Sequence, residues 1–286
     1  MKRIMVLMLM LCLLAGVAAM AEAVGNAPLT PAAGEALVVD LDGDGTDETL
    51  TWAMEPGEYD EAMTLTVTGA DGAPIEYETD ILWGEAVYVV DLDGDGAQEV
   101  LMSGDEMSDD YVTYCLHYAG GALHEVLFPD CGRGENNRGY YRTGYGRITG
   151  IGDNRLTLAG SQDVLGTWFA SRTVALTPWD RFEFFDAGLW ERELGDTSDP
   201  DLWGYGALTL KVSLAFLDLQ DGSTGTLEPG SQLLVYASDK REFARFIARD
   251  GTNGALSISP DYERGWGWLV DGIPEEDCFE QVFYAD

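Results

Sequence analysis

Short apolar segments separated by turn residues recur along most of the chain and predict β-strands. The segments are rich in β-branched and aromatic residues and are bounded by Gly, Pro, Asn and Asp, the pattern of strands joined by tight turns. The predicted strands are 36–39, 49–52, 86–90, 100–102, 111–118, 122–128, 147–151, 155–158, 165–176, 181–185, 207–217, 243–248 and 255–258, and 227–236 is a turn followed by a strand. No helical spacing interrupts them, so we expect an all-β protein.

The first 23 residues follow a different pattern and predict a secretory signal peptide. Lys2 and Arg3 precede an apolar run over 4–17, and small residues follow at Ala19, Ala21 and Ala23. The run is shorter than the roughly 20 residues that a membrane span needs. We expect cleavage near Ala21 or Ala23, a mature chain without a membrane span, and a secreted or cell-surface location.

The composition is strongly acidic. The 286 residues include 51 acids and 16 bases, for a formal net charge of −35, and 46% are hydrophobic. The apolar content is enough for a packed core. Binding to nucleic acid or to anionic lipid is unfavourable because both need clustered Lys and Arg. Hard cations remain as partners, since they prefer carboxylate oxygens.

One internal repeat carries such carboxylates. Residues 38–50 and 89–101 are identical at 10 of 13 positions, with an offset of 51 residues. Each copy has acids at loop positions 1, 3, 5 and 9, and glycines between them allow the chain to coil. Position 7 needs only its backbone carbonyl. The candidate calcium ligands are Asp40, Asp42, Asp44, Thr46 and Glu48 in the first loop, and Asp91, Asp93, Asp95, Ala97 and Glu99 in the second.

The loops differ from EF-hands. An EF-hand carries a bidentate Glu at position 12 and continues into a helix, but position 12 is Thr51 in one copy and Met102 in the other. Apolar, strand-forming residues lie on both sides of each loop. We therefore expect each loop, 40–48 and 91–99, to join two strands and to bind one Ca²⁺, about two ions in all.

These two motifs, Asp40-Leu-Asp-Gly-Asp-Gly-Thr-Asp-Glu48 and Asp91-Leu-Asp-Gly-Asp-Gly-Ala-Gln-Glu99, resemble the calcium loops of FG-GAP and VCBS-type repeats. Such repeats occur in integrin-like β-propellers and in secreted bacterial proteins. The resemblance implies a partial or irregular propeller-like β-repeat domain over 24–192. Residues 147–185 would form a third unit without calcium, because no carboxylate ladder occurs there.

A polar segment over 193–204 predicts a linker to a second domain over 205–286. The second domain contains short strands joined by a Pro-Gly turn and an Asp-Gly hairpin. This meander resembles a bacterial SH3-like barrel; the alternative is that its strands complete one larger β domain.

Histidine and cysteine offer two further candidate pairs. His117 and His124 flank Gly120-Gly121, and a two-residue turn there would place them opposite each other. They would then form either an exposed cross-strand pair or a transition-metal site. Cys115 and Cys131 are the closest cysteines outside the signal peptide and could form a disulfide.

The functional prediction is a non-catalytic binding or adhesion module for an extracellular glycan, a cell-wall polymer or a protein. Aromatic residues in 137–146 and 265–268 would either grip such a ligand or fill the core. The alternative is a secreted polysaccharide hydrolase that uses paired carboxylates. The candidates for that role are Glu106, Asp109, Asp110, Glu183 and Glu191.

Overall fold

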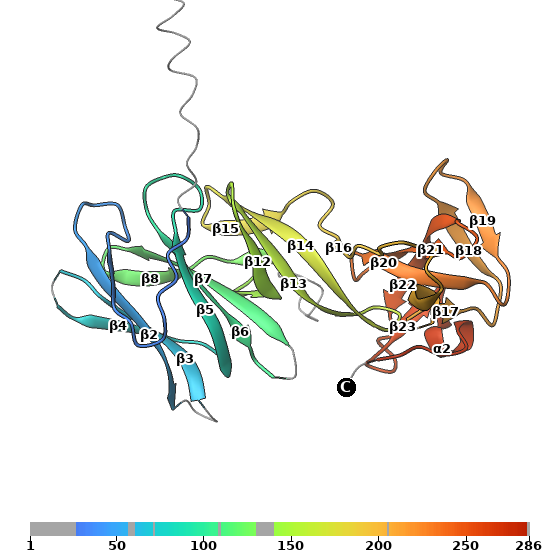
Figure 1. Ribbon diagram of the computed structural model, residues 1–286, viewed down its shortest axis with the longest axis horizontal. Coiled ribbons are helices and arrows are strands. Elements are labelled where there is room, and N and C mark those ends of the chain that lie inside the picture. Colours follow the sequence, from blue (N-terminus) through green and yellow to red (C-terminus); the bar gives the residue numbers. More distant parts are fainter. Residues whose placement is uncertain are drawn as a thin grey trace, which may run out of the picture.

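The computed structural model describes residues 27–56, 61–70, 72–107, 110–129, 140–204 and 206–284. Nearly all of its elements are β-strands paired in antiparallel fashion, which confirms the all-β prediction. Figure 1 shows two lobes, one built from the strands up to β15 and one from β17 onward. Within the described ranges, no closed barrel forms and no helix is long and apolar enough to cross a membrane.

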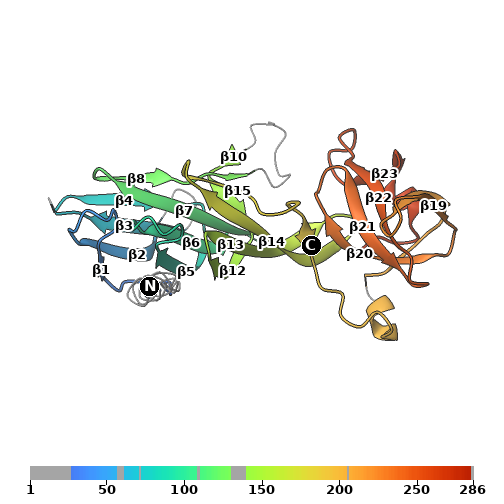
Figure 2. The same ribbon diagram turned by 90° about the horizontal axis from the view of Figure 1, so that it is seen from above.

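The first lobe is built mainly from three antiparallel meanders, called here the first, second and third sheets, each with four strands in chain order (Figures 1 and 2). The third is continuous by hydrogen bonding with the sheet of the second lobe. The first meander comprises β1 (Leu37–Val39), β2 (Glu48–Pro56), β3 (Glu61–Thr68) and β4 (Pro74–Glu78). The second comprises β5 (Trp83–Val90), β6 (Glu99–Asp105), β7 (Tyr111–Ala119) and β8 (Ala122–Glu125). The third comprises β12 (Arg147–Gly152), β13 (Arg155–Asp163), β14 (Thr167–Thr177) and β15 (Arg181–Phe184). Three repeated units were expected from the sequence over this region.

Three short strands connect the second meander to the third. They are β9 (Phe128–Pro129), β10 (Tyr140–Tyr141) and β11 (Thr143–Tyr145). β9 pairs with β10, and β11 adds to the free edge of β7 in the second sheet. At Gly144 in β11 an added Cβ would lie 2.7 Å from the ring of Phe128, so only glycine allows this close approach.

The second sheet is the centre of the first lobe because it is buried on both faces. Val100 and Met102 of β6 belong to the core shared with the first sheet. The residue between them, Leu101, belongs instead to the core shared with the third sheet, as does Cys115 of β7. Successive strand residues point to opposite faces, so packing on both sides explains why β6 is buried at every position except its last. By contrast β13 alternates buried and partly exposed residues.

Backbone hydrogen bonds join the first acidic loop to the second, and the second to the third meander. The N–H of Gln98, just before β6, donates to the carbonyl of Leu41 in the first loop at 2.8 Å. The N–H of Asn154, in the β12–β13 turn, donates to the carbonyl of Leu92 in the second loop at 3.1 Å. Each loop therefore offers the same leucine carbonyl to the following unit, and the third unit occupies the equivalent place without a copy of the acidic loop.

The second lobe is a single curved sheet with a short helix at its end. Its elements are β17 (Leu208–Thr209), β18 (Leu214–Asp218), β19 (Thr224–Leu227), β20 (Gln232–Ser238), β21 (Phe243–Ala248), β22 (Asn253–Pro260), β23 (Trp268–Val270), β24 (Ile273–Pro274) and α2 (Glu275–Cys278). The predicted strand over 207–217 is divided into β17 and β18. The strand is interrupted near Lys211, whose N–H donates to the carbonyl of Cys278 at 2.7 Å and not to a neighbouring strand.

The two lobes meet at β16 (Trp190–Glu191) and at the C-terminal tail. β16 pairs with β14 through Ser171 and with β20 through Ala237 and Ser238, so one hydrogen-bonded sheet runs through both lobes. From the tail, Phe283 accepts a hydrogen bond from the N–H of Thr167 at 2.8 Å. The predicted linker contains only η1 (Pro200–Trp203), a 3-10 helix that begins after Asp199.

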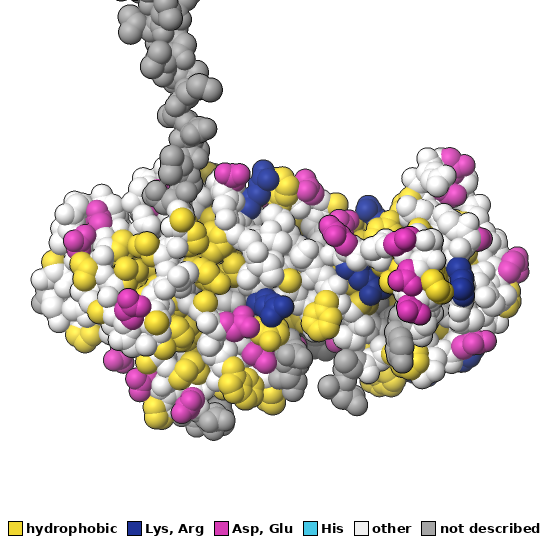
Figure 3. Space-filling model, in the orientation of Figure 1, with side chains coloured by type: hydrophobic (Ala, Val, Ile, Leu, Met, Phe, Trp, Pro, Cys, Tyr) yellow, Lys and Arg dark blue, Asp and Glu magenta, His cyan; other side chains and the backbone are white. Residues whose placement is uncertain are grey.

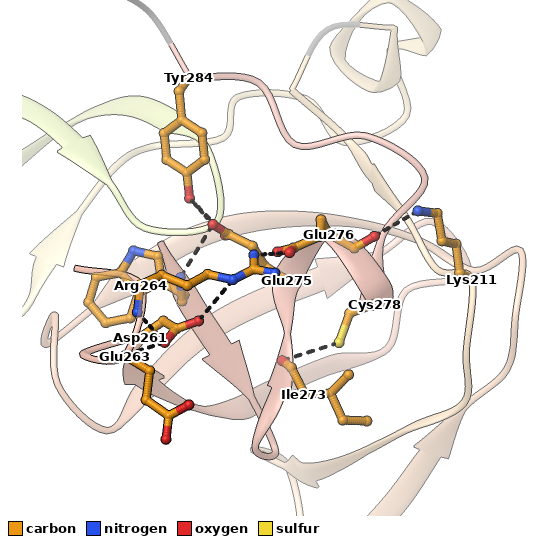
Figure 4. Close-up of polar contacts among 10 residues, drawn as sticks. Lys211, Asp261, Glu263, Arg264, Ile273, Glu275, Glu276, Cys278 and Tyr284 are labelled. Carbon is orange, nitrogen blue, oxygen red and sulfur yellow. Dashed lines mark hydrogen bonds and ion pairs between the residues drawn. The ribbon is translucent and has the colours of Figure 1, made fainter. Parts of the chain in front are cut away.

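A buried carboxylate fixes the tail to the second lobe (Figure 4). Glu275 is 3% exposed and accepts hydrogen bonds from the Tyr284 hydroxyl at 2.8 and 2.7 Å and from the N–H of Trp268 at 3.3 Å. Arg264 lies nearby, paired with Asp261 at 3.7 Å and with Glu276. The indole N–H of Trp268 in turn donates to the backbone carbonyl of Asp163 in the first lobe at 2.5 Å, so this network also holds the lobes together.

Shortening a buried side chain of the middle sheet should destabilise the first lobe strongly. We expect Leu101→Ala to lower the free energy of unfolding by about 2–5 kcal/mol, because Leu101 is fully buried and the cavity lies between two packed sheets. Urea unfolding followed by tryptophan fluorescence measures the change. The control is Val38→Ala in β1, where the side chain is 61% exposed and the expected change is within about 0.5 kcal/mol. Equal effects of the two substitutions would contradict burial of the middle sheet on both faces.

Candidate metal centre

Each acidic loop closes a β-hairpin, as predicted. Val39 of β1 pairs with Glu48 of β2, and Val90 of β5 pairs with Glu99 of β6. The last acid of each loop is thus the first residue of a strand, and both glutamates are 4% exposed. Their position in the ladder fixes where their carboxylates lie, with the coil of the loop above them.

Three carboxylates converge in each loop. One oxygen each from Asp40, Asp42 and Glu48 lies within 4.8 Å of the others. Asp91, Asp93 and Glu99 form the same arrangement in the second loop. Oxygens bound to one Ca²⁺ at about 2.4 Å lie at most about 4.8 Å apart, so each group is compact enough to surround a single ion.

Backbone N–H groups hold the carboxylates in the same way in both loops. Glu48 Oε2 accepts from Leu41 N at 2.9 Å, and Glu99 Oε2 accepts from Leu92 N at 2.7 Å. The first acid of each loop accepts from the glycine five residues on, at 2.9 Å in the first loop and 3.2 Å in the second. These bonds orient the carboxylates and leave further oxygen lone pairs directed into the loop.

One buried oxygen in the first loop lacks a hydrogen-bond donor among the residues that the structure describes. Asp40 Oδ1 is buried and forms no hydrogen bond with any described residue. A buried carboxylate oxygen without a donor is costly, and a cation at the centre of the group would satisfy it. The donor set, all carboxylate oxygen, also suits a hard cation. The residues therefore fit a bound Ca²⁺ on chemistry and on geometry.

Crowding of like charges changes the acidity of the loops. Burial, and then the negative charges of Asp93, Asp95 and Asp91, raise the pKa of Glu99 to about 7. Burial likewise raises the pKa of Glu48 and that of Asp93. Without a cation, these groups can relieve their repulsion only by taking up protons.

The remaining predicted ligands have other contacts. Asp44 and Asp95 lie outside the two convergent groups, and each accepts from the N–H two residues on, Thr46 at 2.7 Å and Ala97 at 2.8 Å. A ligand role for these four residues stays a prediction. The first loop also borders a cavity of about 380 Å³ lined by Asp42, Asp44, Thr46 and Glu48, which gives water access to the coordination positions that protein oxygens leave open.

Sequence reasoning missed that the two loops touch. An added Cβ at Gly43 would lie 3.1 Å from the carbonyl oxygen of Gly96, and Gly43 has φ +71°. Both facts require glycine at this position. The glycine spacing was read only as freedom for each loop to coil, and no feature within one copy reports on contact with the other.

His117 and His124 face each other in the β7–β8 ladder across the Gly120-Gly121 turn, as predicted. They do not belong to any group of three metal-binding side chains in the described ranges. Cys115 and Cys278 are buried free thiols, while Cys131 lies outside the described residues, so the disulfide prediction is untested.

The carboxylates proposed for hydrolysis are spread over the first lobe and the joint. Glu183 pairs with Arg181 at 3.0 Å, and Glu191 lies 3.6 Å from Arg245. Asp109 lies outside the described residues. The two aromatic segments are split between core and surface: Tyr145 and Trp268 are buried, whereas Trp266 is 67% exposed.

Comparison with protein-family models, with curated proteins and with solved structures gives no match to this chain.

The raised pKa of Glu99 predicts how metal-free stability depends on pH. The folded protein holds a proton at Glu99 up to about pH 7, whereas an unfolded glutamate releases it near 4.5. The folded state binds more protons in this window, so stability falls as the pH rises from 4.5 to about 7, by on the order of 3 kcal/mol. Urea unfolding in chelator across this range measures the fall.

Glu99→Gln should flatten that pH dependence because the amide does not titrate. Glu85→Gln, at an exposed position of β5, is the matched control and should leave the pH dependence unchanged. A pH profile that is the same in wild type and Glu99→Gln would contradict a buried, titrating Glu99.

Proposed function

We propose that this chain is a secreted, calcium-binding β-repeat protein of the FG-GAP/VCBS kind. It serves as a non-catalytic binding or adhesion module for an extracellular glycan, a cell-wall polymer or a protein. Two Ca²⁺ ions, one in each acidic loop, stabilise the first lobe. The second lobe, in this proposal, is a small SH3-like domain that contributes to the same surface.

The observation that carries the calcium assignment is the equivalence of the two loops. The same three positions converge in both copies, with the same backbone donors and a buried glutamate at the same place in the ladder. A solvated acidic turn needs no such repeated geometry. Two copies with one arrangement support a shared ligand.

Calcium is the ion that fits best because it supplies charge neutralisation to a set of hard oxygen donors. Asp40, Asp42 and Glu48 would hold one ion, and Asp91, Asp93 and Glu99 the other. The first loop contains five acids over 40–48 and the second contains four over 91–99. Each site carries more negative charge than one Ca²⁺ neutralises, which strengthens the preference for a divalent ion.

A structural role for the ions follows from where the loops lie. The first loop joins β1 to β2 in the first sheet, and the second joins β5 to β6 in the middle sheet. The first loop is hydrogen-bonded to Gln98, just before β6. An ion that binds only the folded loop stabilises the fold by about 2.7 kcal/mol per site at 100 times its Kd. Calcium would thus keep the repeat region folded outside the cell, where a binding surface has to persist.

Calcium titration of the metal-stripped protein tests the proposal. Isothermal titration calorimetry should show two ions bound, with Kd values near 10⁻⁴–10⁻³ M, typical of extracellular modules. Asp42→Asn and Asp93→Asn should each remove one site, and the double variant should remove both. Excess chelator should lower the melting temperature of the wild type and leave that of the double variant unchanged.

Asp47→Asn is the matched control for these variants. Asp47 lies in the first loop but outside its convergent group, and the second copy has Gln98 at this position. This variant should retain both sites with at most a small loss of affinity. Absence of binding up to several millimolar Ca²⁺, or equal losses in Asp47→Asn and Asp42→Asn, would refute specific calcium loops.

A further inference from the structure

A row of four residues crosses the joint between the lobes. Arg147 of β12 is opposite Ala159 of β13, Ala159 is opposite Ser171 of β14, and Ser171 is opposite Glu191 of β16. Directly opposed residues lie on the same face of a sheet. The row therefore has charged side chains at its two ends and small ones between. Three strand spacings make it about 14 Å long.

This row forms the floor and ends of a groove of about 780 Å³. Phe169, two residues before Ser171 on the same face of β14, lines it and is 66% exposed. Tyr111 lines the groove beside Arg147, and Arg192 and Glu193 line it beside Glu191. Ligand sites commonly lie at such joints between structural units. The groove thus combines an exposed aromatic ring with charged groups at opposite ends.

The two arginines of the groove are not used in ion pairs. The Arg147 guanidinium lies 5.4 Å from the Tyr111 ring centroid. Arg192 donates from Nε to the carbonyl of Val235 at 2.8 Å and lies 5.3 Å from the Trp168 ring centroid. Within the described ranges, neither arginine has a carboxylate within ion-pair distance.

Four other arginines in the described part of the chain do have an acidic partner. Arg142, Arg181, Arg245 and Arg264 each pair with a carboxylate. The chain has 51 acids for 16 bases, and Figure 3 shows acidic side chains scattered over both lobes with few basic ones among them. Arg147 lines the groove without an acidic partner and is therefore available to an external anion, whereas the guanidinium of Arg192 packs against the buried Trp168.

We propose that this groove binds an extended acidic glycan. A carboxylate of the glycan pairs with Arg147 at one end, and a sugar ring stacks against Phe169. Glu193 accepts hydrogen bonds from sugar hydroxyls. Arg245 lies 3.6 Å from Glu191 and reduces the negative charge at that end. The inference deepens the ligand-binding part of the proposed function, and it does not require bound calcium.

The floor of the groove favours a glycan over an extended acidic peptide. A peptide that binds as a strand needs a free sheet edge. Ala159 and Ser171 are paired with each other and with a further strand on their outer sides, so the floor offers no free edge. Sugars instead bind through ring faces and hydroxyls, which match Phe169 and Glu193.

A matched pair of tetrasaccharides tests the inference. One probe alternates glucuronate with N-acetylglucosamine, and the other is the neutral tetramer of N-acetylglucosamine. Calorimetric titration at saturating calcium should show the acidic probe binding at least tenfold more tightly, with an affinity that falls as salt is added. Arg147→Gln should lower the affinity for the acidic probe roughly tenfold, and Phe169→Ala should lower the affinity for both probes.

Two variants on the same lobe are controls. Arg155 lies 3.6 Å from the Phe185 ring centroid, a contact like that of Arg147, but it lies outside the groove, so Arg155→Gln should bind normally. Trp179→Ala removes an exposed ring elsewhere and should also bind normally. Melting curves establish that all variants are folded.

Equal affinity for both probes, no binding of either, or equal loss in Arg147→Gln and Arg155→Gln would overturn the inference. Tighter binding of a tetraglutamate peptide than of the acidic glycan would overturn the choice of ligand class. The same titration on Asp42→Asn/Asp93→Asn separates the two proposals. Glycan binding that persists in this variant supports the groove whatever the calcium result, and normal calcium titration without glycan binding refutes only the groove.

Discussion

Burial of the second sheet on both faces is the constraint on which the rest of the first lobe depends. Leu101 packs toward the third sheet, and its neighbours Val100 and Met102 pack toward the first. With the middle sheet fixed, its β5–β6 loop lies between the loop of the first sheet and the β12–β13 turn of the third. Two backbone hydrogen bonds join the loops in this order: Gln98 N–H donates to one leucine carbonyl, and Asn154 N–H donates to the other. The same stacking places β14 where β16 can extend it into the second lobe.

The acidic loops show how packing and electrostatics oppose each other. The ladder buries Glu48 and Glu99, and the coil above brings further carboxylates toward them. Backbone N–H groups compensate part of the charge, yet the pKa of Glu99 still rises to about 7. A proton or a cation must balance what remains. The two loops lie against each other at Gly43 and Gly96.

Local features were predictable from the sequence, and features assembled from distant segments were not. The strands, the Gly120-Gly121 hairpin and the two acidic loops each depend on a few neighbouring residues, so pattern and spacing reveal them. The break at Lys211 depends on the carbonyl of Cys278, and the predicted strand there was therefore too long. The row from Arg147 to Glu191 draws one residue from each of four strands. Nothing in any one of those segments marks it as part of a groove.

The joint between the lobes has a mechanical consequence. The two lobes share few backbone hydrogen bonds: those of the two-residue strand β16, with the tail contact of Phe283 and the indole contact of Trp268 beside them. Within each lobe, by contrast, long ladders must separate together. Tension applied to the two ends of the chain would therefore separate the lobes before it separates the strands within either lobe. The joint would act as a hinge that yields under load while each lobe keeps its fold.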